Sequence, residues 1–204
     1  MQIHAKHPQM LYLDEKLAQI NEETLKSALD ALPEWRRQQA LCHKHQRGQA
    51  ECALSYLLLC KGLRDMGIEL QPTFEYGKNG KPSLKELPCV HFNLSHCKEA
   101  VACAISDKPI GVDIERLGRY SERLAQYTMN EKELEEINQA EDRDVAFTRL
   151  WTMKEATMKL TGEGISTNVR NVLEHSSNII IYRTSVNTER GYVVTVAEWA
   201  DENQ

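Results

Sequence analysis

Two acidic residues, Asp113 and Glu115, are spaced so that they could hold a metal ion. They belong to the segment GVDIE at positions 111–115, whose alternation predicts a strand with both carboxylates on one face. Two carboxylates in this arrangement can bind one hard cation through oxygen. The pattern alone favours a half-buried strand with its polar residues outside. The metal hypothesis gains weight if a third carboxylate, such as Glu155, lies close by, because clustered like charges repel unless a cation intervenes.

The third carboxylate belongs to the stretch FTRLWTMKEATMKLTGEG at positions 147–164. Apolar residues cover almost the whole circumference of this predicted helix, which is typical of a buried helix. A narrow polar strip remains, and we expect it to face a cleft: Thr148, Thr152, Glu155 and Lys159. Because Glu155 and Lys159 are one turn apart, a plain surface ion pair is the alternative. Lys154 lies on the main apolar face, where a buried charge needs a partner that this helix does not supply.

The composition of the chain indicates a soluble globular protein. Of its 204 residues, 41% are hydrophobic and 27% are charged, which allows one large domain or two small lobes. The formal net charge of −5 argues against nucleic-acid binding, which requires a basic face. No apolar segment approaches the length of a membrane span, and the first residues lack the pattern of a secretory signal. We therefore expect a cytoplasmic protein that binds neither nucleic acid nor membrane.

Groups of helices and strands alternate along the chain. Helices are predicted at 22–31, from Pro33 onward, and at 49–67, 131–142 and 147–164. Strands are predicted at 68–76, 90–94, 100–106, 110–114, 176–185 and 192–200. Residues 77–82 form a turn-rich loop, and residues 116–129 show no regular pattern. This order favours an α+β fold, with two lobes of similar size.

Four short motifs in this order resemble the phosphopantetheinyl transferases, and specifically their double-length Sfp-type branch. The motifs are GKP at 80–82, FNLSH at 92–96, GVDIE at 111–115, and WTMKE at 151–155 followed by Lys159. The resemblance covers most of the chain, from about Arg47 to Lys159. It implies a monomer of two similar α+β lobes in a pseudo-twofold arrangement, with the N-terminal lobe at 1–109 and the C-terminal lobe at 110–204. Coenzyme A would bind in the cleft between the lobes.

The resemblance also implies a reaction. The 4′-phosphopantetheine arm of coenzyme A would be transferred to a serine of an acyl or peptidyl carrier protein, with adenosine 3′,5′-bisphosphate as the other product. The family pattern assigns magnesium to three residues: Asp113, Glu115 and Glu155. Lys159 would contact the pyrophosphate, and Glu155 would orient or deprotonate the serine, directly or through a metal-bound water. We treat Glu155, Lys159 and Asp113 as the catalytic set.

The same family pattern places the rest of coenzyme A. His96, together with Ser95, would bind the 3′-phosphate, and Arg47, just before the long helix, would support phosphate binding. Residues 76–82, which include Lys81 and Pro82, would lie near the adenine. Magnesium commonly completes its coordination with substrate phosphates and water rather than with protein groups alone. A pyrophosphate-containing ligand therefore agrees with the carboxylates and cations found from the residues themselves.

Carrier proteins are usually acidic, and this chain is acidic too. A local basic patch is therefore needed for docking, and we assign it to Arg116, Arg119 and Arg123. Two other functions use the same residues. The first is a metal-dependent hydrolase of phosphoanhydrides that activates water through Asp113, Glu115 and Glu155. The second is a non-catalytic module that only binds coenzyme A or a carrier protein.

Overall fold

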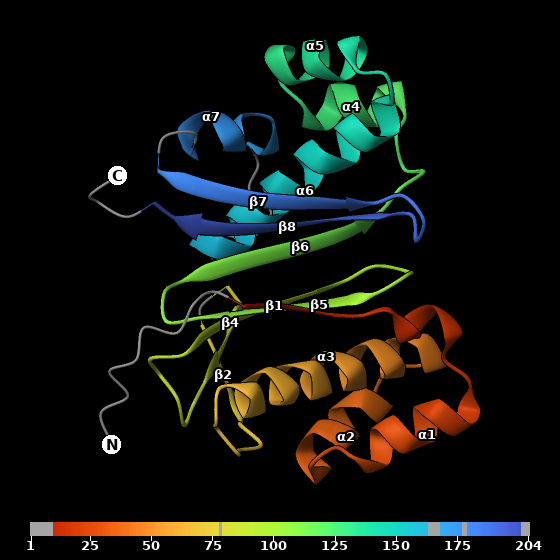
Figure 1. Ribbon diagram of the computed structural model, residues 1–204, viewed down its shortest axis with the longest axis vertical. Coiled ribbons are helices and arrows are strands. Elements are labelled where there is room, and N and C mark those ends of the chain that lie inside the picture. Colours follow the sequence, from red (N-terminus) through yellow and green to blue (C-terminus); the bar gives the residue numbers. More distant parts are fainter. Residues whose placement is uncertain (1–9, 78, 163–167, 177–178, 201–204) are drawn as a thin grey trace.

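Two three-stranded antiparallel sheets form the centre of the molecule (Figure 1). The computed structural model describes residues 10–77, 79–162, 168–176 and 179–200. The first sheet, in the order β1-β5-β4, contains β1 (Met10–Asp14), β5 (Val101–Ser106) and β4 (His91–His96). The second, in the order β6-β8-β7, contains β6 (Ile110–Arg116), β8 (Tyr192–Trp199) and β7 (Ile180–Asn187). Each sheet packs against one long helix, α3 (Gln46–Asp65) or α6 (Arg143–Thr161).

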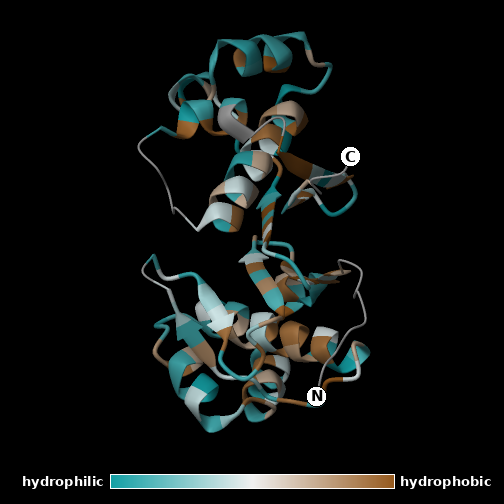
Figure 2. Ribbon diagram, turned by 90° about the vertical axis from the view of Figure 1, so that its left-hand side faces the viewer, coloured by the Kyte–Doolittle hydropathy of each residue, from teal (hydrophilic) through white to brown (hydrophobic). Residues whose placement is uncertain are grey.

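Shorter elements surround these layers. Helices α1 (Glu22–Asp30) and α2 (Glu34–Leu41) pack on α3, while α5 (Glu131–Gln139) and α7 (Val172–Ser176) pack on α6. The others are η1 (Glu15–Gln19), α4 (Glu122–Thr128), η2 (Val169–Asn171) and a hairpin of β2 (Phe74–Tyr76) and β3 (Pro82–Leu84). Figure 2 shows the two halves one above the other, with many hydrophilic residues on the outermost helices. Within the described residues, no helix combines the length and apolar character needed to cross a membrane.

The two halves repeat one order of elements. Each three-stranded sheet takes one strand from before its long helix and two from after it, and the last of these is the centre of the sheet. The hairpin of β2 and β3 is an addition to the first half. This arrangement confirms the predicted α+β fold class. We propose the lobe boundary between residues 109 and 110, as expected from the sequence, because β6 begins at Ile110 directly after the short turn that follows β5.

Strand β5 is buried on both faces, and its alternating residue sizes explain how the halves come together. Val101, Cys103 and Ile105 belong to the core formed with α3. Ala102 and Ala104 belong to the second core, which contains the apolar residues of β6 and β8. Because side chains alternate along a strand, the larger residues fill the space under α3. The alanines allow the second sheet to approach closely.

Gly111 in β6 allows α6 to lie directly on the second sheet. A Cβ atom at this position would lie 2.1 Å from the carbonyl oxygen of Ala156 and 2.7 Å from the backbone nitrogen of Leu160. Protein interiors are too closely packed to accept such contacts without displacement. The same stretch of α6 carries the polar strip, so this glycine determines how near that strip comes to the acidic face of β6.

Two sequence expectations for this fold are wrong. Of the strand predicted at 68–76, only Phe74–Tyr76 is a strand, because Pro72 lacks the backbone N–H that a sheet ladder needs. Residues 116–129, expected to be irregular, contain helix α4. Its start is fixed by Ser121, whose side chain accepts a hydrogen bond from the Leu124 backbone N–H, a cap that the sequence pattern should have revealed.

Other boundaries shift by a few residues. Helix α3 begins at Gln46, so Arg47 lies in its first turn and not before it. Helix α6 begins at Arg143, where the side chain of Asp142 accepts hydrogen bonds from two backbone N–H groups. It ends before Gly162, whose φ of 74° closes the helix. The predicted Gly164 and residues 177–178 lie outside the described residues.

Lys154 has a partner from another helix. Its side chain has no solvent exposure, and its Nζ lies 2.8 Å from Oε1 of Glu133 in α5. The same ammonium donates hydrogen bonds to the carbonyl oxygens of Val169 (3.0 Å) and Arg170 (2.8 Å). Glu133 also caps α5 by accepting from the backbone N–H of Asn130. Lys154 therefore ties α6 to α5 and to η2, which accounts for a lysine on the apolar face.

Replacing Lys154 with methionine is expected to lower the free energy of unfolding by about 3 kcal/mol, because Glu133 would remain buried without its counter-charge. The double variant Lys154→Met/Glu133→Gln should recover much of this loss, since glutamine can still cap Asn130 but carries no charge. Urea unfolding measures both effects. If the single variant is as stable as the wild type, the buried pair makes no net contribution.

Candidate functional site

The site lies where β4 of the first sheet runs beside β6 of the second. Two side chains of β4 bind the backbone of β6: Asn93 Oδ1 accepts from Val112 N (2.9 Å) and Ser95 Oγ accepts from Ile114 N (3.3 Å). Side chains thus satisfy backbone donors that a continuous sheet would satisfy with carbonyls. The two halves are held together at this seam, and the polar face of α6 covers it.

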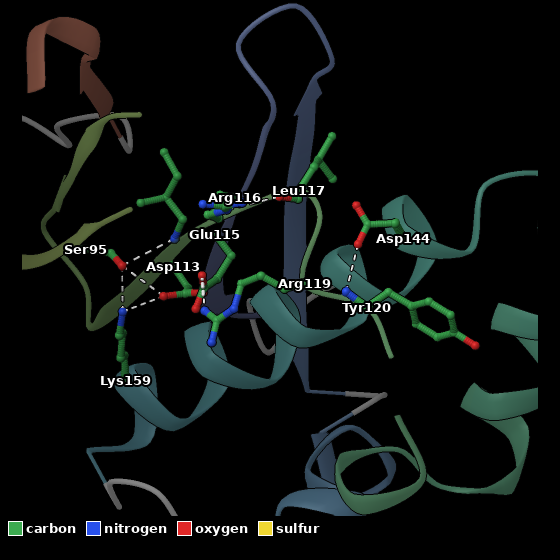
Figure 3. A network of polar contacts seen from close by, with 10 residues as sticks. Ser95, Asp113, Glu115, Arg116, Leu117, Arg119, Tyr120, Asp144 and Lys159 are labelled. Atoms are coloured by element: carbon green, nitrogen blue, oxygen red, sulfur yellow. Dashed lines mark hydrogen bonds and ion pairs between the residues drawn. The ribbon is translucent and has the colours of Figure 1, made fainter. Parts of the chain in front are cut away.

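Asp113, Ser95 and Lys159 form the buried centre of the site (Figure 3). The Ser95 hydroxyl donates to Asp113 Oδ1 (2.9 Å), and Lys159 Nζ donates to the same oxygen (2.7 Å) and to Ser95 Oγ (2.8 Å). The other oxygen of Asp113, Oδ2, is buried and has no hydrogen-bond partner among the described residues. Lys159 thus reaches across to β6, and one carboxylate oxygen remains available for a cation.

Glu155 lies one turn before Lys159 and completes a cluster of three carboxylates. Burial raises the pKa of Glu155, and the charge of Asp113 raises it further. Lys159 acts in the opposite direction, and Glu115 adds a smaller upward effect. The charges on the acidic face of β6 therefore act on Glu155, and the joint binding of a metal by the three carboxylates stays a prediction. Such mutual destabilisation of like charges is what a bound cation would relieve.

Glu115 lies at the edge of this cluster and is paired with Arg119. Arg119 Nη1 is 2.6 Å from Glu115 Oε2. The loop that carries Arg119 is held by Asp144 of α6, whose carboxylate accepts from the backbone N–H groups of Gly118 and Tyr120. Figure 3 shows the contact with Tyr120. Asp144 is a positioning residue that the sequence reasoning missed. The helix was predicted to begin at residue 147, so the place of Asp144 in the first turn of α6 became clear only from the structure.

The three carboxylates fit a cation that is shared with a ligand better than one enclosed by protein. In the described stretches of the chain, no three His, Cys, Asp or Glu side chains are gathered closely enough to hold a metal by themselves. Magnesium typically keeps several waters and uses one or two carboxylates plus substrate phosphates. Two features suit this kind of site. Oδ2 of Asp113 has no hydrogen-bond partner among the described residues, and burial and neighbouring carboxylates disfavour the ionised form of Glu155.

A pocket of about 290 Å³ opens on the Lys159 side of the cluster. Its lining residues come from both halves: Asn79, Gly80, Lys81, Pro82, Asn93, Leu94, Glu155, Met158, Lys159 and Gly162. Lys81 Nζ donates to the Leu160 carbonyl oxygen (3.0 Å), and Asn79 Nδ2 donates to that of Gly162 (2.8 Å). Burial lowers the pKa of Lys81. The predicted loop therefore reaches the C-terminal end of α6 and forms one wall of the pocket.

A second, basic pocket lies on the Glu115 side. Its lining residues are Arg47, Glu51, His96, Cys97, Lys98, Glu115, Arg116 and Arg119. The structure brings Arg47 and His96 together here, but it turns Ser95 toward Asp113. Neighbouring residues of a strand point to opposite faces, so Ser95 and His96 lie on different sides of β4. Glu51, which pairs with both Arg47 and His96, was also missed, because the sequence analysis placed Arg47 before the helix. With the helix beginning at Gln46, the four-residue spacing makes Arg47 and Glu51 a helical ion pair.

An α+β fold in which two similar sheets meet at a seam, with charged side chains and a pocket on each side of it, limits the class to which this chain can belong. Comparison with known proteins identifies the class. Residues 109–197 match the model of the 4′-phosphopantetheinyl transferase superfamily. The chain is 31% identical over 163 residues to the 4′-phosphopantetheinyl transferase Sfp of Bacillus subtilis strain 168, a match that covers 76% of this chain and 70% of that protein.

Two further relatives match shorter stretches. The 4′-phosphopantetheinyl transferase psf-1 of Bacillus pumilus is 41% identical over 98 residues, which are 47% of this chain and 42% of that protein. The 4′-phosphopantetheinyl transferase HetI of a Nostoc species is 36% identical over 110 residues, which are 50% of this chain and 46% of that protein. The chain belongs to the 4′-phosphopantetheinyl transferases, an enzyme family, and within them to the Sfp type. The predicted family is confirmed.

Proposed function

We propose that this protein transfers the 4′-phosphopantetheine arm of coenzyme A to a serine of an apo acyl or peptidyl carrier protein and releases adenosine 3′,5′-bisphosphate. The observation that carries the proposal is the seam cluster, where Lys159 and the unpartnered oxygen of Asp113 adjoin two further carboxylates. Such a cluster suits a pyrophosphate bound together with magnesium. The proposed setting is the cytoplasm, and the proposed state is a monomer.

The residues of the cluster have separate tasks in this reaction. Asp113, Glu115 and Glu155 would hold magnesium, which when bound supplies positive charge beside the pyrophosphate. Glu155 would take the proton of the carrier serine, directly or through a water. Lys159 donates to the phosphate oxygens. The serine oxygen forms a bond to the β-phosphorus of coenzyme A, and the bond from that phosphorus to the leaving adenosine bisphosphate breaks.

The two pockets, one on the Lys159 side and one on the Glu115 side of the carboxylate cluster, suggest how coenzyme A is bound. We place the adenine near Lys81 and Pro82, as the family pattern implies, and the 3′-phosphate at Arg47 and His96, which share the basic pocket. The hydroxyl of Ser95 is committed to Asp113 and Lys159. In the structure Ser95 therefore orients those two groups, and its expected share in binding the 3′-phosphate beside His96 stays a prediction.

The carrier protein is proposed to dock next to the cluster, over α4 and the loop before it. Arg116 and Arg119 line the basic pocket, and Arg123 lines a groove on α4 together with Tyr127, whose exposure is 75%. Basic side chains around an exposed aromatic ring suit an acidic partner with an apolar contact at its centre. This surface supplies the local positive charge that the acidic chain as a whole lacks.

One experiment tests the function against its rivals. The purified protein is incubated with coenzyme A, magnesium and a panel of apo carrier proteins, and the carriers are weighed by mass spectrometry. A mass increase equal to phosphopantetheine, dependent on magnesium, supports transfer. Hydrolysis of coenzyme A without a carrier identifies the phosphoanhydride hydrolase. Binding of coenzyme A without either reaction identifies the non-catalytic module.

Coenzyme A and magnesium are expected to stabilise the protein more together than the sum of their separate effects. Each would supply part of the binding site of the other, so their affinities are coupled and the coupling is reciprocal. The measurement is the melting temperature with neither ligand, each ligand and both, in the wild type and in Asp113→Asn. Additive shifts in the wild type would count against a shared site, and the variant should show additive shifts only.

A further inference from the structure

Glu51 lies in the basic pocket between the two groups that we assign to a phosphate. Its Oε1 is 2.8 Å from Arg47 Nε, and its Oε2 is 3.2 Å from His96 Nε2. The Glu51 side chain is 20% exposed, whereas that of His96 is 50% exposed. A single carboxylate from α3 therefore bridges Arg47 and His96 from the inner side of the pocket.

This bridge occupies donors that a phosphate at Arg47 and His96 would use, while Lys98 and Arg116 are further cations that line the pocket. The other acid of the pocket, Glu115, is paired with Arg119. The second contact of Arg47 is a hydrogen bond from its Nη2 to the Cys97 carbonyl oxygen (2.9 Å). A phosphomonoester resembles a carboxylate in accepting charge-assisted hydrogen bonds, but it carries up to twice the charge. Glu51 and a bound phosphate would thus require the same two partners.

We propose that Glu51 is an internal anion that competes with bound phosphomonoester for Arg47 and His96, and so limits how tightly this end of the cleft holds a nucleotide. This role rests on the proposed function, in which coenzyme A brings the 3′-phosphate and adenosine 3′,5′-bisphosphate leaves with it. The incoming phosphate must draw Arg47 and His96 away from Glu51 or share them with it, and the two anions repel each other at short range. Weaker binding of adenosine 3′,5′-bisphosphate would speed its release, so that the next coenzyme A can bind.

The variant Glu51→Gln tests the competition, because glutamine keeps the shape and an oxygen acceptor for Arg47 but removes the charge. The probes are adenosine 3′,5′-bisphosphate and adenosine 5′-monophosphate, which differ in the 3′-phosphate alone, and calorimetry measures both affinities. We expect the bisphosphate to bind about tenfold more tightly to the variant and the monophosphate to change less than about twofold. The gain should shrink as salt is added, because screening weakens charge repulsion.

Asp65→Asn is the matched control. Asp65 pairs with Lys61 at 2.6 Å on the same helix, but it does not line the pocket, so its neutralisation should leave both affinities unchanged. Equal or weaker binding of the bisphosphate to Glu51→Gln overturns the proposal and would make Glu51 a residue that only orients Arg47 and His96. If this happens while the wild type still modifies carriers, the proposed function stands. A wild type that neither modifies carriers nor binds the bisphosphate overturns both.

Discussion

Replacing Glu155 with glutamine is expected to reduce the turnover of carrier protein by roughly 10²- to 10⁴-fold, which is the usual contribution of a general base. Glutamine has nearly the same size, but it can neither accept the serine proton nor supply a charged ligand to magnesium. The loss should appear in kcat more than in the KM for coenzyme A, because Lys159 and the basic pocket still bind the phosphates. Steady-state transfer with varied coenzyme A measures both parameters.

The same variant is expected to be more stable than the wild type in the absence of ligands. Burial and the charge of Asp113 raise the pKa of Glu155, so the folded protein binds this proton more tightly than the unfolded chain does. Stability is therefore lost as the pH rises through the folded-state pKa. Glutamine cannot ionise, so the melting temperature of Glu155→Gln should exceed that of the wild type at neutral pH. The difference should disappear near pH 4, which is about the pKa of a glutamate in the unfolded chain.

Glu189→Gln provides the control for this comparison, because Glu189 is an exposed glutamate in the turn between β7 and β8. Its substitution should change neither turnover nor melting temperature appreciably. A Glu155→Gln enzyme with nearly normal turnover would remove Glu155 from the catalytic set. If the variant loses turnover but is no more stable than the wild type, repulsion among the three carboxylates does not destabilise the ligand-free protein.

Much of the cluster could be predicted because two local periods determine which residues share a face. The period of two places Asp113 and Glu115 on one side of β6, and the period of 3.6 places Glu155 and Lys159 on one side of α6. The period of two also places Ser95 and His96 on opposite faces of β4, and in the structure Ser95 turns toward Asp113. The assignment of both residues to the 3′-phosphate came from the resemblance and stays a prediction.

What local patterns could not predict are contacts made across the fold. Lys154 finds Glu133 on another helix, and nothing in the sequence around either residue points to the other. The close approach of α6 to β6 depends on Gly111, whose meaning is clear only once Ala156 is known to lie above it. Lys159 likewise prefers Asp113 and Ser95 on the seam, although a pair with Glu155 was equally open from the sequence.

Replacing Lys159 with alanine is expected to lower kcat/KM for coenzyme A by roughly ten- to hundredfold, the equivalent of about 1.5–3 kcal/mol for a charge-assisted contact to phosphate. Lys159→Arg should retain part of the activity, because the charge persists but the planar guanidinium cannot reproduce the point-like contact with both Asp113 and Ser95. Lys159→Glu should be the least active, since it adds an anion beside three carboxylates and the phosphates. Steady-state transfer ranks the three variants.

Stability must be measured in the same variants, because Lys159 also neutralises Asp113, whose side chain is only 5% exposed. Alanine at position 159 leaves that carboxylate without its counter-charge and should destabilise the fold. The double variant Lys159→Ala/Asp113→Asn removes both charges, so it should regain stability but not transfer. Lys132→Ala, at an exposed position of α5, is the control for loss of a lysine. Recovery of transfer in the double variant would show that Lys159 serves the fold of the seam and does not contact the phosphates.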